Sequence, residues 1–165
     1  DASPETRRVG LTSSGNLDFV RQTGLYDLVL AYDHVADLPA EPSVSVDFAG
    51  NSGLLRQIHE TLGDHLKYSC SVGMTHVEAR AGTGAPMPGP TPTLFFAPDH
   101  AVALVKDMGP QAFGAAVARS WQGFVALSDT LLQVEKRRGI AAAAGAFAET
   151  YAGKADPAVG IVILP

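Results

Sequence analysis

Short apolar runs and helix-spaced apolar positions alternate along the first half of the chain. Four runs, at 8–12, 28–31, 44–48 and 68–73, are too short for helices and are typical of buried parallel strands. Apolar positions at helical spacing predict one helix from residue 17 to Gly24 and another from residue 54 to Gly63, since glycine commonly ends a helix.

The second half is more helical. A glycine- and proline-rich stretch, 81–91, predicts a loop or lid, and 93–96 a fifth strand. A helix is predicted from Pro98 to Asp107, where Gly109 and Pro110 break it. The apolar stripe that follows predicts one long amphipathic helix over 111–138, closed by its basic last turn. An alanine-rich helix to about residue 151 and a closing strand at 161–164 complete the chain.

Strands that alternate with helices through short connections predict an α/β fold built on a parallel sheet. We expect a single domain over 1–165. Its sheet-forming part covers about 7–110, a helical segment about 111–153, and the closing strand 160–164.

The amino-acid composition argues against several classes of protein. A 46% hydrophobic content can fill a core, and the net charge of −5 with scattered basic residues argues against a nucleic-acid surface. No apolar run reaches the roughly 18 residues that span a bilayer. The single cysteine, Cys70, cannot form an intramolecular disulfide, fits a cytoplasmic location, and shows no zinc-ligand spacing with the histidines.

Candidate binding residues follow from the rule that ligands of open parallel sheets lie beyond the carboxyl ends of the strands. Four such edges are predicted: 12–16, 32–33, 47–53 and 71–76. The stretch 49–53 has two glycines at a helix start, which favours close approach of a ligand to backbone amides or simply a tight turn.

Hydroxyl side chains end the first strand. Thr12, Ser13 and Ser14 stand where an acidic residue would favour NAD, and they could donate instead to the 2′-phosphate of NADP. Helix capping is the equally weighted alternative for these residues.

Several motifs are absent or weak. The chain has no G-x-G-x-x-G, no phosphate-binding P-loop and no G-x-S-x-G, so a self-contained dinucleotide site and a hydrolase nucleophile have no support.

Cys70 with His59 or His76 could form a thiol–base pair, although a buried inert cysteine is the favoured interpretation. His76, followed by Glu78, is a polar group past the fourth strand or a solvated loop residue, and no catalytic residue is assigned.

An ordered set of segments resembles a bacterial family of unknown function, itself similar to a divergent, zinc-free, quinone-reductase-like branch of the medium-chain dehydrogenase/reductases. The resemblance runs from about residue 7 to 164. The segments are Val9-Gly10-Leu11-Thr12-Ser13, Tyr26-Asp27, Tyr32-Asp33, Val46-Asp47-Phe48-Ala49-Gly50, 68–76, 88–90, 95–98 and 153–160.

The resemblance implies a partial Rossmann-type parallel sheet with flanking helices, in which the first strand and its glycine-rich loop are absent and lie upstream with a GroES-like catalytic segment. It implies NADP as the cofactor and no metal. The positions that it assigns to the cofactor run from the adenosine ribose to the nicotinamide: Thr12, Ser13, Ser14, Tyr32, Asp33, Asp47, Gly50, Val72 and Gly73. Asp18 departs from the pattern, since a basic residue is expected near there, although Arg8 or Arg21 could substitute.

Two functions remain open at this stage. The first is part of an NADP(H)-dependent oxidoreductase acting on a small molecule, in which the protein positions the cofactor and excludes water. The second is a non-catalytic binding module that keeps the fold. The strand edge left by the absent first strand predicts a homodimer, or a folded core with disordered ends.

Overall fold

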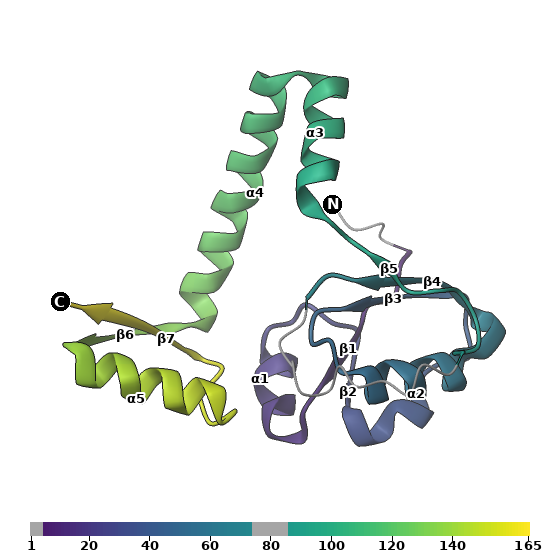
Figure 1. Cartoon of the computed structure of the whole chain (residues 1–165), viewed down its shortest axis with the longest axis horizontal. Coiled ribbons are helices and arrows are strands. Elements are labelled where there is room, and N and C mark those ends of the chain that lie inside the picture. Colours follow the sequence, from purple (N-terminus) through teal and green to yellow (C-terminus); the bar gives the residue numbers. More distant parts are fainter. Residues whose placement is uncertain (1–4, 74–85) are drawn as a thin grey trace.

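The computed structural model describes residues 5–73 and 86–165 as a mixed α/β fold with small parallel sheets and flanking helices (Figure 1). This confirms the predicted α/β class. The strands form three separate sheets, β1–β2, β3–β4–β5 and β6–β7, where the sequence had predicted one domain-wide sheet.

The first sheet pairs β1 (Val9–Thr12) with β2 (Leu28–Ala31) in parallel, and α1 (Leu17–Gln22) connects them. In both strands every second residue is buried. A 3₁₀ helix, η2 (Tyr32–Asp37), follows β2 and buries Val35 beside it.

The second sheet contains β3 (Ser43–Asp47), β4 (Leu66–Ser71) and β5 (Thr93–Leu94), all parallel. Helix α2 (Ser52–Leu62) connects β3 to β4 and buries Leu62 and His59. The Asn51 side chain caps α2 by accepting a hydrogen bond of 3.1 Å from the Leu54 amide. Gly63 ends the helix with a φ of 48°, as the sequence predicted.

One face of this sheet is uncovered. Val44, Val46 and Phe48 are 61%, 52% and 64% exposed, and Tyr68, the register partner of Val44, is also exposed. The opposite face carries Ser45 and Ser69, which is fully buried. This sheet is therefore covered on one side only, whereas parallel sheets usually have both faces covered.

Helices α3 (Ala97–Met108) and α4 (Pro110–Leu131) form a hairpin that projects from the β3–β4–β5 sheet (Figure 1). Gly109 turns the chain between them with a φ of 82°, a conformation that L side chains rarely adopt. The predicted helix from Pro98 and its break at Gly109 and Pro110 are confirmed.

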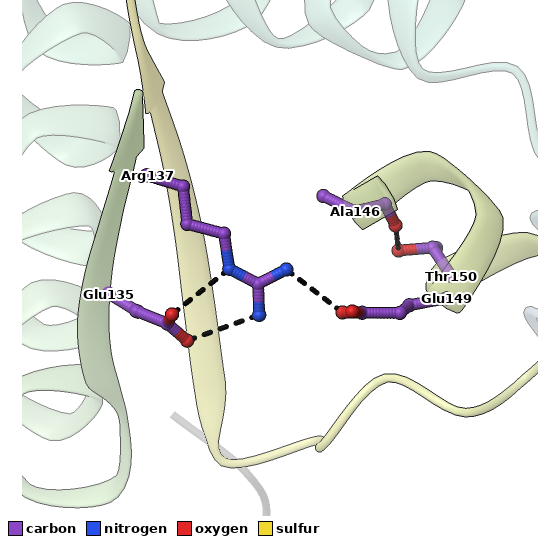
Figure 2. Close-up of polar contacts among 5 residues, drawn as sticks. All are labelled: Glu135, Arg137, Ala146, Glu149 and Thr150. Atoms are coloured by element: carbon purple, nitrogen blue, oxygen red, sulfur yellow. Dashed lines mark hydrogen bonds and ion pairs between the residues drawn. The ribbon is translucent and has the colours of Figure 1, made fainter. Parts of the chain in front are cut away.

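The third sheet pairs β6 (Gln133–Arg138) with β7 (Val159–Leu164), and α5 (Ile140–Tyr151) connects them at the far end of α4 (Figure 1). The Arg137 guanidinium on β6 connects this strand to α5. It donates to both carboxylate oxygens of Glu135, at 3.0 and 3.2 Å, and to Glu149 on α5 at 3.0 Å (Figure 2).

The prediction of a helix over 111–138 is wrong in its last part. Helix α4 ends at Leu131, and 133–138 is the strand β6, which lies inside the predicted helical segment 111–153. Pairing with β7 along six consecutive residues outweighs the local helical preference of this basic stretch. The hydroxyls of Ser128 and Thr130 donate to carbonyls of the last turn, at 2.8 and 2.7 Å, a competition with the backbone that is typical near helix ends.

In the part of the chain that the structure describes, no helix is long and apolar enough to cross a membrane.

Candidate functional site

The carboxyl end of β3 is organised around Asp47. One of its carboxylate oxygens accepts hydrogen bonds of 3.0 Å from both the Ala49 and the Gly50 amides. Its backbone carbonyl accepts from the amides of Val72 at 2.8 Å and Gly73 at 3.3 Å, which follow β4. Asp47 therefore holds together the loops that leave two neighbouring strands.

Gly73 lies where only glycine fits. A Cβ atom on this residue would lie 2.4 Å from the Phe48 carbonyl oxygen, closer than real Cβ contacts. The backbone of the β4 exit therefore packs directly against the backbone of the β3 exit.

Tyr32 brings the first sheet to the same edge. It directly follows β2, and burial, with a further contribution from the negative charge of Asp47, raises the pKa of its phenol. The phenol remains protonated at neutral pH and can donate a hydrogen bond. Tyr32 therefore lies near enough to Asp47 for the carboxylate charge to act on its phenol, although β2 and β3 belong to different sheets.

The hydroxyl side chains of Thr12, Ser13 and Ser14 follow each other at the end of β1. Thr12 is buried and pairs with Ala31 of β2, the residue before Tyr32. Ser13 and Ser14 are exposed. Ser13 occupies the N-cap position of the 3₁₀ helix η1 (Ser14–Asn16), but its side chain makes no capping hydrogen bond. Helix capping therefore does not account for the Ser13 hydroxyl.

The loop 49–53 behaves differently from a phosphate cradle. The amides of Ala49 and Gly50 donate to the Asp47 carboxylate, and the Asn51 side chain accepts a hydrogen bond from the Leu54 amide. A carboxylate where a phosphate would lie repels an anion. Of the two interpretations of this stretch, the geometry favours the tight strand-to-helix turn.

A buried polar chain beneath the second sheet was not predicted. His59 is fully buried, and its Nδ1 donates to the Pro88 carbonyl at 2.8 Å. In the neutral ring its Nε2 accepts from the Ser69 hydroxyl at 2.9 Å, and the Ser45 hydroxyl donates to Ser69 at 3.2 Å. The position of His59 on the apolar side of α2 was the only sequence signal.

These contacts also bear on the thiol–base hypothesis. Cys70 is buried, and both ring nitrogens of His59 are occupied by Ser69 and Pro88. His59 is therefore committed to other partners, in agreement with the interpretation of Cys70 as a core residue. His76 and Glu78 lie outside the described residues.

The basic residues considered for the 2′-phosphate are paired with carboxylates. Arg21 lies 3.4 Å from Asp18, and the side chain of Arg8 lies 3.5 Å from Asp27. The Arg8 backbone amide also donates to Asp27 at 2.7 Å, and these hydrogen bonds lower the pKa of that carboxyl. Both guanidiniums are about half exposed, which leaves part of each accessible to an anion.

Comparisons with known proteins give one family. Residues 1–156 match the family described as protein of unknown function (DUF2855), and the chain belongs to it. Neither the curated proteins nor the solved structures include a significant match. Across 5–73 and 86–165, no group of three or more metal-ligating side chains could hold a metal ion.

Proposed function

We propose that this member of the DUF2855 family is part of an NADP(H)-dependent oxidoreductase, with a Rossmann-type arrangement in which the strand ends around Asp47 face the cofactor. The observation that carries the proposal is the convergence of Tyr32, Asp47 and Gly73 from the ends of β2, β3 and β4. Dinucleotides of open parallel sheets bind at such an edge.

The residues fit the adenosine end of a dinucleotide better than its middle. The Ser13 and Ser14 hydroxyls can donate to a 2′-phosphate. The loop 49–53 does not fit the pyrophosphate, because its first two amides, those of Ala49 and Gly50, already donate hydrogen bonds to the Asp47 carboxylate. The proposal therefore requires a pyrophosphate-binding turn other than this loop.

In this proposal the chain's own residues bind and orient. Tyr32, held protonated, donates to an acceptor at the strand ends, and Asp47 keeps the two exit loops in place. The bound cofactor supplies hydride transfer to or from a small molecule. No proton-transfer residue is assigned.

The test is a titration of the protein, as its gene encodes it, with NADPH and NADH, followed by cofactor fluorescence and calorimetry. We expect tighter binding of NADPH. The double substitution Ser13→Ala with Ser14→Ala should weaken NADPH roughly 100-fold, since each of the two hydrogen bonds to a charged group contributes about 1.5 kcal/mol, and should leave NADH nearly unchanged. Ser128→Ala, on α4, is the matched control. Binding of neither cofactor would refute the proposal.

A non-catalytic binding module is the second candidate, favoured by the single observation that the loop 49–53 carries a carboxylate in place of an anion site. Asp47→Ala separates the two candidates. If the strand ends face a cofactor, removing the carboxylate releases the amides of Ala49 and Gly50, loosens the β3 exit loop and weakens NADPH binding. If the fold serves another ligand, NADPH binding stays absent in both forms of the protein.

A further inference from the structure

The pairing between β3 and β4 contains a one-residue irregularity. Ser43 pairs with Leu66, whereas the next residue, Val44, pairs with Tyr68, so the pairing passes over Lys67. An extra residue of this kind is a β-bulge, and it changes which side chains of the bulged strand face each side of the sheet. Simple alternation along β4 therefore does not describe its two faces.

The bulge turns a serine toward α2 and a tyrosine toward solvent. Leu66 and Ser69 both lie on the side of the sheet that α2 covers, and both are buried. Tyr68 lies on the opposite face and is 44% exposed. This arrangement reverses the usual preference, because apolar side chains gain free energy by leaving water, whereas hydroxyl groups lose it unless they are hydrogen-bonded.

A regular register without the bulge would follow the apolar pattern better. Continued alternation from Leu66 would turn Tyr68 toward α2 and Ser69 toward solvent, since a one-residue slip moves every side chain to the other face. Asp47 would then pair with Cys70, one residue earlier than its observed partner. The observed register therefore requires an interaction that Ser69 makes only when it is buried.

His59 on α2 supplies that interaction. Its ring is fully buried, and its Nε2 accepts a hydrogen bond of 2.9 Å from the Ser69 hydroxyl. Its Nδ1 is held by the Pro88 carbonyl at 2.8 Å, and the Ser45 hydroxyl on β3 donates to Ser69 at 3.2 Å. These hydrogen bonds compensate for the burial of the Ser69 hydroxyl.

We propose that His59 is a positioning residue that selects the bulged register of β4 against β3. Without its hydrogen bond to Ser69, β4 slips by one residue into the regular register. The slip moves the β4 exit by about 3.3 Å along the strand. It separates the Gly73 amide from the Asp47 carbonyl, which that amide reaches at 3.3 Å in the bulged register. The inference does not depend on the proposed cofactor.

The experiment reads the register of the full chain through a disulfide to the native Cys70. Val46 is the register partner of Cys70. Opposite residues of neighbouring strands lie about 4.8 Å apart, a Cα separation that a disulfide can span. Val46→Cys should therefore form a disulfide with Cys70 when oxidised glutathione is added, as measured by intact mass and thiol titration. In the slipped register Cys70 faces α2, away from residue 46, and the disulfide does not form.

His59→Leu, which occupies the buried site without hydrogen bonds, should slow disulfide formation in the Val46→Cys background at least about tenfold. Adding Tyr68→Thr should restore the rate, because it removes the apolar gain of the slipped register. A general loss of stability would not be reversed by this second substitution. His65→Leu, at an exposed position, is the matched control and should leave the rate unchanged.

Circular dichroism checks that each variant folds, and His59→Met takes the place of His59→Leu if the leucine variant loses helicity. Three results would overturn the proposal. They are no disulfide in the chain that keeps His59, an unchanged rate in a folded His59 variant, or a slowed rate that Tyr68→Thr does not restore.

Discussion

The two halves of the chain use different kinds of stabilisation. The buried residues of the described part of the chain all lie between 9 and 73: Gly10, Thr12, Val29, Ala31, Val35, His59, Leu62, Leu66, Ser69 and Cys70. Among the described residues from 86 onward none is fully buried, although helices and a six-residue parallel strand pair are present. Backbone hydrogen bonds alone keep secondary structure only marginally stable, so the second half depends on cover from another surface.

The candidate site belongs to the half that has the core. Tyr32 and Gly73 follow β2 and β4, which contain buried residues, and Asp47 is tied to the β4 exit by hydrogen bonds to the amides of Val72 and Gly73. The α3–α4 hairpin belongs to the half without a core. A binding site needs a rigid frame, and only the first half has the buried residues that provide one.

The largest expected effect concerns His59. His59→Ala should lower the free energy of unfolding by about 3 kcal/mol, because it leaves a cavity and removes the partners of Ser69 and the Pro88 carbonyl. Urea unfolding measures this loss. His65→Ala, at an exposed position, should change stability by less than about 0.5 kcal/mol. Equal effects of the two substitutions would show that the first half has no such core.

A second test uses the glycine at the β4 exit. Gly73→Ala should cost about 1–3 kcal/mol, because its Cβ meets the Phe48 carbonyl, a backbone atom that cannot turn away. Gly15→Ala has open space around it and should be neutral in the same unfolding experiment. If Gly73→Ala were also neutral, the close approach of the β3 and β4 exits would be wrong.

The smallest effect concerns the second half. Hydrogen bonds from Arg137, and its charge, lower the pKa of Glu135 in the folded chain. The contribution of the pair is therefore present above the usual carboxyl pKa and is lost as the pH falls through the lowered value. Thermal unfolding measured from about pH 6 down to about pH 2 should show this loss. Arg137→Met should flatten that part of the profile, and an unchanged profile would contradict the account.

The sequence predicted local elements well where a local signal exists. Gly24, Gly63 and Gly109 end helices at the predicted places, and 28–31 forms β2 as expected. The strand β6 escaped prediction because its partner β7 begins 26 residues after β6 does, and only that pairing makes the stretch extended. The division into three sheets was missed for the same reason, since strand order is not a local property.

The candidate site was predictable in part. The rule that ligands lie at strand ends selected Tyr32, Asp47, Gly50, Val72 and Gly73, which the structure gathers around Asp47. The rule could not show that Asp47 occupies the amides of its own loop, because a turn and an anion site share the same residue types. The contact of His59 with Ser69 and Pro88 depends on three distant segments and leaves no pattern in the sequence.

Hydrogen exchange tests the difference between the halves most directly. We predict slow exchange in β2 and β4 and faster exchange in α4. Protection of α4 equal to that of β4 would contradict the account, because it would mean that the second half is as stable as the half with buried residues.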